Sequence, residues 1–312
     1  MVAPVALIAG VLVIPFASRV AQRAGLVDRP GPLKVHRHAV PYLGGIGIAA
    51  ALVCGLVTTR PSLLVPLGLA LLLGVIDDAW GVPPVARLAG EGAIGVALGL
   101  TIPLWEPRVV GVLFAVVITI ALCNSVNMVD GYDGLAGLVT VVAAAGFYTV
   151  LSGDAARLAL VLAVGAAAFL AFNLPPAGVY LGDGGAYLIG ATLAALTLFA
   201  CRENSGASFE IALLFIAYPI IELIFAIVRR TADRQSPLEG DRQHLYDQLH
   251  TRGISPLTAT ALCVAFQIAL VIVGVVLSRH SEATGVYVAG GCGMMILAAG
   301  VLGGFAAPDS KR

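Results

Sequence analysis

The chain has 312 residues, of which 59% are hydrophobic and only 12% are charged, and its mean hydropathy is +0.96. A soluble domain is about 45–50% apolar and about 25% charged, so one globular core could not bury this much apolar surface, and we predict a polytopic membrane protein. The 18 Lys and Arg residues balance the 18 Asp and Glu residues, which excludes the strong basic field of a nucleic-acid-binding protein.

Eleven apolar stretches approach the length of a membrane-spanning helix, which is roughly 17–25 residues. In chain order they lie near residues 2–20, 43–59, 61–76, 87–104, 108–124, 134–151, 157–172, 185–201, 208–228, 256–277 and 285–306. Because an unpaired backbone is too costly in lipid for open strands, the predicted fold class is all-α. We expect a polytopic integral membrane helical bundle of about eleven helices, with residues 1–312 forming a single transmembrane domain.

The cations are distributed unevenly over the connections between these stretches. With eleven crossings, one side of the membrane holds thirteen of the eighteen Lys and Arg residues. The other side holds the remaining five: Arg60, Arg108, Arg157, Arg202 and Arg279. By the positive-inside rule the first side is cytoplasmic, so we expect the N-terminus outside, the C-terminus in the cytoplasm and the protein in the inner (plasma) membrane. The two long polar connections, residues 21–42 and 229–255, then both lie in the cytoplasm.

Four clusters of polar side chains border the apolar stretches. They are Asp77 with Asp78, the run of Asn124, Asn127, Asp130 and Asp133, the single Asp183, and the group of His244, Asp247 and His250. The alternation of spans places all four on the cytoplasmic side. Ionisable groups at the ends of apolar helices are costly, so we interpret these clusters as functional.

The run from Asn124 to Asp133 has polar groups at every third position, so a helix that continued through it would carry them on one face. The alternative is a helix end followed by a solvated turn. Likewise, the Gly-Asp-Gly around Asp183 also suits an ordinary turn, and residues 229–255 also suit a solvated loop that obeys the positive-inside rule.

The aspartates suggest a site for a hard cation. Mg²⁺ prefers oxygen ligands and usually binds through one or two carboxylates together with waters and substrate phosphates. Mn²⁺ is an alternative, whereas no Cys/His cluster indicates zinc. Lys34, Arg37 and Arg242 lie in the two polar connections and would attract phosphate, and His244 adds a donor suited to a phosphate or a nucleotide.

Five ordered motifs resemble those of the polyprenyl-phosphate N-acetylhexosamine-1-phosphate transferases, a family that includes the muramoyl-pentapeptide transferase of peptidoglycan synthesis and the WecA-like transferases. The motifs are GLVDRPGPLKVHRHAVPYLGG, LGVIDDAWGVPPVARLAGE, NSVNMVDGYDGLAG, VYLGDGGAYLIG and PLEGDRQHLYDQLHTRG. The Asp-Arg-x-His form of the last is closer to the WecA-like branch. The resemblance implies that a polyprenyl phosphate (undecaprenyl or decaprenyl) attacks a UDP-sugar with Mg²⁺, releasing UMP, as the first membrane step of cell-wall or surface polysaccharide synthesis.

The resemblance also implies roles for particular residues. Asp183 would bind the metal, and Asp77 would deprotonate or position the lipid phosphate with Asp78 beside it. The expected catalytic residues are Asp77, Asp78, Asp130 and His244, and the expected substrate-binding residues are Lys34, Arg37, Asn124, Asn127, Asp133 and Arg242. The expected partners are the UDP-sugar, the polyprenyl phosphate and the lipid bilayer, with a homodimer left open.

The sequence leaves the sugar donor and the role of Glu91 open. The histidine loop of the family often reads His-x-His-His, whereas this chain has His244 followed by Leu, Tyr and Asp, so a hexosamine other than N-acetylglucosamine remains an alternative. Glu91 stands where Gln is more usual, and its role does not follow from the sequence.

From other classes of protein, the alternatives are a secondary transporter, whose carboxylates would bind a coupling ion, and an inactive scaffold.

Overall fold

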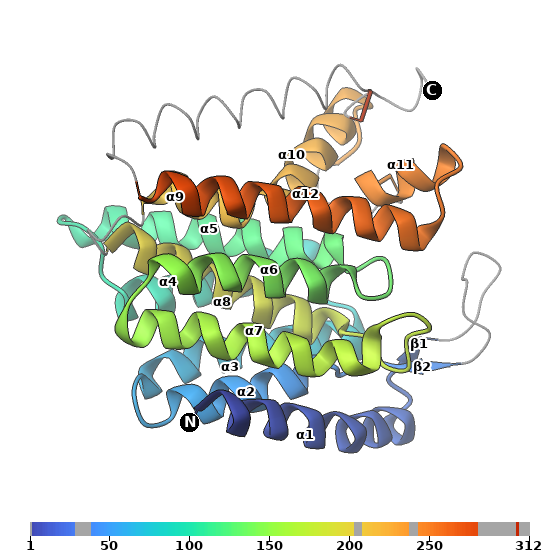
Figure 1. The fold of residues 1–312 in the computed structure, drawn as a ribbon, viewed down its shortest axis with the longest axis horizontal. Helices are drawn as coiled ribbons and strands as arrows, with labels where there is room; N and C mark the ends of the chain where they lie inside the picture. Colours follow the sequence, from blue (N-terminus) through green and yellow to red (C-terminus); the bar gives the residue numbers. More distant parts are fainter. Residues whose placement is uncertain (1, 29–38, 203–207, 237–242, 280–303, 306–312) are drawn as a thin grey trace.

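The computed structural model describes residues 2–28, 39–202, 208–236, 243–279 and 304–305 (Figure 1). Its elements are α1 (Val2–Ala24), β1 (Val27–Asp28), β2 (Val40–Pro41), α2 (Gly45–Leu56), the 3₁₀ turn η1 (Pro61–Leu63), α3 (Leu64–Trp80), α4 (Pro84–Thr101), α5 (Arg108–Val129), α6 (Leu135–Val150), α7 (Gly153–Asn173), α8 (Gly182–Arg202), α9 (Phe209–Phe215), α10 (Ala217–Ala232), α11 (Leu245–Thr251) and α12 (Pro256–Leu277). Within the described residues the only strands are the two-residue antiparallel pair β1 and β2, so the all-α prediction is confirmed there.

Six helical segments among the described residues are long and apolar enough to cross a membrane: α1, η1 with α3, α5, α7, α8 and α12. The bent pair α9 and α10 makes a seventh if it is counted as one span. The predicted stretches 43–59 and 134–151 form the shorter helices α2 and α6, and most of 285–306 lies outside the described residues. A multi-pass helical membrane protein is therefore confirmed, whereas eleven crossings and the orientation of the termini stay predictions.

Helix α8 lies in the middle of the bundle, where 18 of its 21 residues are buried. It packs closely against α3 and α5. A Cβ atom on Gly74 of α3 would collide with the backbone of Asp183, and one on Gly190 of α8 would collide with the backbone of Cys123 in α5. Small residues at such contacts let helix backbones approach closely, which is a main source of helix association in a membrane. These contacts fix the N-terminus of α8 beside the last turn of α3.

The polar run that follows the fifth predicted stretch is not one helical stripe. Helix α5 ends at Val129, and Asp130 at its C-cap leaves the helical conformation. Gly134 then adopts a φ of +79°, a left-handed conformation that glycine reaches without steric cost, before α6 begins. Asn124 and Asn127 therefore lie on α5, whereas Asp130 and Asp133 lie in the turn that follows it.

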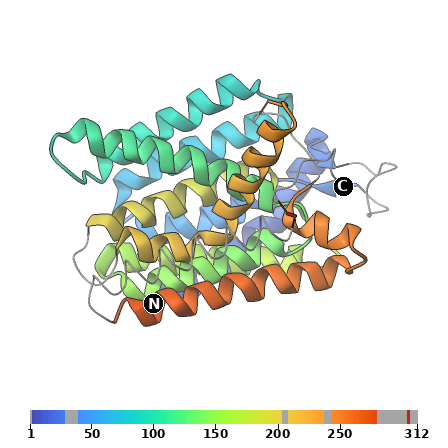
Figure 2. The same cartoon turned by 90° about the horizontal axis from the view of Figure 1, so that it is seen from above.

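The predicted stretch 208–228 is broken into α9 and α10, which meet at an angle of 82°. Pro219 has no N–H to donate to the carbonyl of Phe215 four residues earlier, and such prolines interrupt a helix. Gln267 of α12 supplies the missing donor, because its Nε2 lies 2.7 Å from that carbonyl oxygen. Its Oε1 accepts from the backbone N–H of Tyr218 at 2.9 Å. In Figures 1 and 2, α10 leaves the common direction of the other long helices.

The two long polar connections contain more regular structure than the sequence predicted. Helix α1 continues into residues 21–24, and β1 pairs with β2 inside the 21–42 connection. Helix α10 continues to Ala232, and α11 lies within the 229–255 connection. Three predicted site residues in these connections, Lys34, Arg37 and Arg242, lie outside the described residues.

Candidate active site

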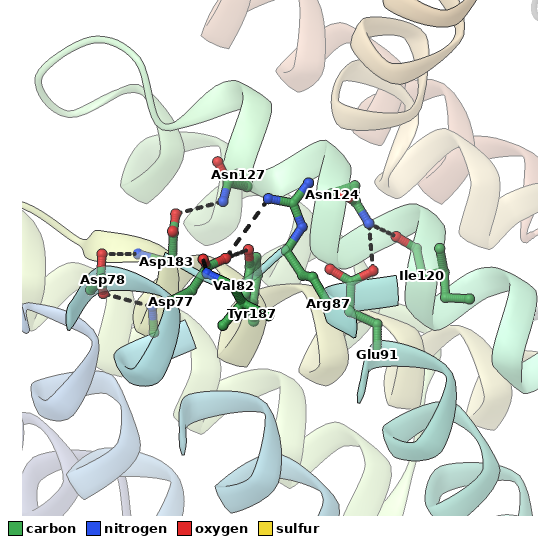
Figure 3. A network of polar contacts seen from close by, with 11 residues as sticks. Asp77, Asp78, Val82, Arg87, Glu91, Ile120, Asn124, Asn127, Asp183 and Tyr187 are labelled. Carbon is green, nitrogen blue, oxygen red and sulfur yellow. Dashed lines mark hydrogen bonds and ion pairs between the residues drawn. The ribbon is translucent and has the colours of Figure 1, made fainter. Parts of the chain in front are cut away.

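The polar clusters meet at one end of the bundle. Because successive helices run in opposite directions, the C-terminal ends of α3 and α5 lie beside the N-terminal end of α8, near α11 and the β1–β2 pair (Figure 1). Side chains from these ends form the hydrogen-bonded network in Figure 3. The structure thus brings together the acids that the alternation of spans predicted to share one face.

Asp78 caps the N-terminus of α8. Its Oδ1 accepts from the backbone N–H of Asp183 at 3.0 Å, and its Oδ2 accepts from that of Gly184 at 3.1 Å (Figure 3). The first N–H groups of a helix have no partner within the helix, and the helix dipole favours a negative charge there. Asp78 therefore fixes where α8 begins and, with it, the position of Asp183.

Asp77 is held from three sides. Its Oδ1 accepts from the backbone N–H of Val82 at 2.7 Å, and its Oδ2 accepts from the hydroxyl of Tyr187 at 2.7 Å. The Nη1 of Arg87 lies 3.8 Å from the same Oδ2, and the Asp77 side chain is only 7% exposed. These contacts, drawn in Figure 3, fix the orientation of the carboxylate.

Asp183 differs from the two α3 acids because one of its oxygens is open. Its Oδ1 accepts from the side-chain amide of Asn127 at 2.6 Å, and no described residue donates to its Oδ2. Asp130 follows Asn127 by one turn, and no described residue donates to its carboxylate either. Burial raises the pKa of Asp130 well above its ordinary value, and the charges of Asp183, Asp78 and Asp133 add to this. The two acids thus share a region of strong negative potential with unused oxygen atoms.

A second part of the network lies deeper between α4 and α5. Glu91 is fully buried, and its Oε2 accepts from the side-chain amide of Asn124 at 2.6 Å. Asn124 also donates to the carbonyl of Ile120 at 2.9 Å. The Oε1 of Glu91 and the Nε of Arg87 have no hydrogen-bond partner among the described residues. The predicted substrate-binding residue Asn124 is therefore engaged with Glu91, whose place in the site the sequence left undefined.

Asp133 and its neighbours tie the turn after α5 to the connection before α8. Its Oδ2 accepts from the backbone N–H of Ala177 at 2.9 Å. Nearby, Asn173 accepts from the N–H of Gly134 and donates to the carbonyl of Val179, both at 2.9 Å. A substrate-binding role for Asp133 stays a prediction.

His244 lies at the N-cap of α11 and is nearly buried, with 7% exposure. Its Nδ1 lies 3.5 Å from the Oε2 of Glu222 on α10, and its ring stacks on that of Tyr246 at a centroid distance of 5.4 Å. The hydroxyl of Tyr246 donates to the carbonyl of Met128 at 2.8 Å. Since Met128 is two residues before Asp130, this contact places His244 near the acidic end of α5.

The structure adds two residues that hold site side chains and that were not predicted, Tyr187 and Glu222. Tyr187 follows Asp183 by four residues on α8, so the i, i+4 spacing would have placed it on the same helix face. Glu222 is an acid inside an apolar stretch, which is by itself a signal of function. Both signals are readable in the sequence.

The donor set decides whether a metal would fit here. Among the described residues, no group of three or more His, Cys, Asp or Glu side chains is arranged to hold a metal ion by itself. Mg²⁺ does not require such a group, because it is commonly held by one or two carboxylates, with waters and substrate phosphates completing its ligands. The open Oδ2 of Asp183 and the unpaired carboxylate of Asp130 fit this requirement, whereas the oxygens of Asp78 are used by the start of α8.

The fold and the site define a multi-pass membrane protein with an acidic site at the helix ends. Residues 61–200 match the model of glycosyl transferase family 4. The decaprenyl-phosphate N-acetylglucosaminephosphotransferase of Mycolicibacterium smegmatis is 32% identical, covering 78% of this chain and 73% of the relative. The undecaprenyl-phosphate α-N-acetylglucosaminyl 1-phosphate transferase of Escherichia coli is 30% identical, over 86% and 80%. A probable undecaprenyl-phosphate N-acetylglucosaminyl 1-phosphate transferase of Bacillus subtilis is 28% identical, over 80% and 77%. The chain belongs to glycosyl transferase family 4, among its polyprenyl-phosphate N-acetylhexosamine-1-phosphate transferases.

Proposed function

We propose that the protein transfers N-acetylglucosamine 1-phosphate from UDP-N-acetylglucosamine to undecaprenyl or decaprenyl phosphate. An oxygen of the lipid phosphate forms a bond to the sugar-bearing phosphorus of the donor, the bond between the two donor phosphates breaks, and UMP leaves. The observation that carries this proposal is the pair of carboxylates with open oxygens, Asp183 and Asp130, at one end of an apolar bundle, with Asp77 and Arg87 close to Asp183. The sugar and lipid named by the relatives agree with it.

Phosphoryl transfer depends mainly on positioning and on neutralisation of charge. Asp183 and Asp130 are the residues that would hold Mg²⁺, with Mn²⁺ as a substitute, and the ion would neutralise the donor diphosphate. Asn127 fixes the Asp183 carboxylate through its 2.6 Å hydrogen bond. Arg87 adds a positive charge close to where the two substrates would meet.

Asp77 is proposed to position the lipid phosphate. The second pKa of a phosphate monoester is about 6, so most of the acceptor is already doubly ionised at neutral pH and needs only a weak base. Tyr187 and Arg87 fix the orientation of Asp77, and the same contacts hold it close to the start of α8. His244, near the end of α5, is proposed to bind the phosphates or the sugar.

The site is proposed to face the cytoplasm of the inner membrane, within eleven crossings and with the N-terminus outside. The excess of cations on the predicted cytoplasmic side supports this orientation. A reporter fused after Arg252 should then read cytoplasmic, and a periplasmic signal would invert the assignment. The transporter alternative expects acids near the midplane of the membrane, whereas these acids lie at helix ends.

The proposed reaction is tested with detergent-solubilised protein, Mg²⁺, undecaprenyl phosphate and a panel of UDP-N-acetylhexosamines. We expect release of UMP and formation of a polyprenyl-diphosphate-sugar, with UDP-N-acetylglucosamine as the best donor. The Asp183→Asn variant serves as the inactive control. Absence of UMP with every donor of the panel would refute the proposal, and a different preferred donor would change only the sugar.

A further inference from the structure

We propose that Glu222 is a positioning residue, which orients His244 and ties it to the bend between α9 and α10. This inference rests on the function proposed above, because it assumes that His244 binds the sugar-nucleotide. Glu222 lies on α10, is 1% exposed, and is separated from His244 by 22 residues in the sequence.

Two donors hold the Glu222 carboxylate, and the imidazole of His244 faces it. The N–H of Leu245 lies 3.0 Å from Oε1 and 3.1 Å from Oε2, so the carboxylate holds the first residue of α11 with both oxygens. The hydroxyl of Tyr218 donates to Oε1 at 2.8 Å. The Nδ1 of His244 faces Oε2 at 3.5 Å. A buried carboxylate is costly unless donors such as these satisfy it, so its presence in an apolar helix calls for a function.

This arrangement defines which side of the imidazole ring is used. Nδ1 lies on the side of Glu222, Nε2 points away from it, and the His244 side chain also accepts from the backbone N–H of Asp247 in the first turn of α11. Stacking on Tyr246, which is hydrogen-bonded to the end of α5, limits rotation of the ring. Glu222 and Tyr246 thus hold His244 from two elements, α10 and α11.

Glu222 is also connected, through Tyr218, to the break between α9 and α10. Tyr218, which donates to Glu222 through its hydroxyl, is also held by its backbone N–H to Gln267 of α12. Gln267 is fully buried and bonds the carbonyl groups that the break leaves without partners. The direction of α10, and therefore the position of Glu222, is set by this buried contact. The bend thus places a buried acid of α10 against the start of α11.

The test is a double-mutant cycle on Glu222 and His244. Glu222→Gln keeps the size of the side chain and an oxygen that accepts from Leu245, and it removes the charge facing the imidazole. We expect kcat/KM for UDP-N-acetylglucosamine to fall by about 10- to 100-fold, the range for losing one interaction with a buried charge, while KM for the lipid acceptor is unchanged. The His244→Ala variant should lose as much, and Glu222→Gln should cost less than about 2-fold in the His244→Ala background.

A matched control is Glu210→Gln, the same change on α9 at the opposite end of the bundle, which should keep full activity. Equal losses from Glu222→Gln with and without His244 would overturn the inference and make Glu222 a structural residue only. Activity within about 2-fold of the unaltered protein in Glu222→Gln would also overturn it. If Glu222→Gln does not fold, His244→Gln breaks the same pair from the other side while Leu245 stays attached, and unchanged kinetics would refute the inference.

Binding of UDP-N-acetylglucosamine, measured by calorimetry on the same variants, separates this inference from the proposed reaction. If the unaltered protein binds the nucleotide sugar without releasing UMP, and Glu222→Gln weakens binding about 10-fold only when His244 is present, the reaction is wrong and the positioning role stands. If UMP is released but the two residues are not coupled, the reaction stands and the positioning role is wrong. A protein that does not bind the nucleotide sugar contradicts both.

Discussion

The acids at the end of α3 differ from the acids at α5 and α8 in how many of their oxygens are already used. Both oxygens of Asp78 accept from the backbone at the start of α8, and both oxygens of Asp77 accept from Val82 and Tyr187. In contrast, Asp183 keeps one open oxygen, and the carboxylate of Asp130 has no donor among the described residues. The α3 acids therefore build the site, whereas Asp183 and Asp130 are the ones prepared for a ligand.

The difference between the α3 acids and Asp183 follows from how α3 packs against α8. Asp78 is bonded to the backbone of Asp183 itself, and Gly74 one turn earlier lets α3 approach that same backbone. The position of the open carboxylate is thus set by its neighbour on another helix rather than by its own side-chain contacts. Substitutions in the two groups of acids should consequently have different effects on stability and on turnover.

The largest effect on turnover is expected for Asp183→Asn. It removes the charge of the proposed metal ligand, so kcat should fall by about 1000-fold, while the amide keeps the size of the side chain and the fold. Turnover is measured as UMP release, and folding as the thermal midpoint in detergent. Asp154→Asn, an acid paired with Arg60 at the other end of the bundle, is the control and should stay active. Activity within 10-fold of the unaltered protein in Asp183→Asn would remove Asp183 from its role.

Asp130→Asn should lower kcat by about 100-fold and, in the presence of a chelator, raise the stability of the protein. Burial raises the pKa of Asp130 in the folded state above its unfolded value of about 4, so the folded protein loses stability as pH rises through the interval between these two values. The variant has no titrating group there, so its thermal midpoint should depend less on pH. An unaltered pH dependence in Asp130→Asn would contradict this account of the acid.

Asp78→Asn should give the opposite combination, a smaller loss of turnover with a loss of stability. An amide has one oxygen, so one of the two N–H groups at the start of α8 loses its acceptor, which costs about 1–3 kcal/mol. We expect a lower thermal midpoint and a kcat reduced about 10-fold, as for other residues that hold a catalytic ligand in place. If stability is unchanged and turnover is abolished, Asp78 binds a substrate directly and the contrast with Asp183 fails.

The smallest effect is expected for Tyr187→Phe. It removes one of two hydrogen bonds to the Asp77 carboxylate. Because Oδ1 stays bonded to Val82 and Arg87 stays beside Oδ2, kcat should fall by only about 3-fold without a change in KM for the sugar-nucleotide. Steady-state kinetics with varied lipid phosphate checks this. A loss above 100-fold would assign Tyr187 a direct part in the reaction.

Much of this site was predictable from the sequence because it depends on the alternation of spans. Once the apolar stretches are counted, Asp78, Asn127 and Asp183 fall on the same end of the bundle, and the structure joins them by hydrogen bonds. The other predicted site residues, Lys34, Arg37 and Arg242, lie outside the described residues.

Other features depend on contacts that periodicity does not encode. The pairing of Asn124 with Glu91 joins α5 to α4, and either residue alone could equally face a substrate. The end of α5 at Val129 depends on where Asp130 leaves the helix, although polar residues continue with the helical spacing. The break at Ile216 was marked by Pro219, but the apolar sequence on both sides concealed a bend of 82°.

The most direct test of the contrast between the two groups of acids is the binding of Mn²⁺, followed by electron paramagnetic resonance in the presence of UDP. The unaltered protein and the Asp77→Asn variant should bind the ion with similar affinity, and Asp183→Asn should bind it at least about 10-fold more weakly. Equal Mn²⁺ binding by Asp183→Asn and the unaltered protein, or a loss of binding in Asp77→Asn alone, would contradict the account.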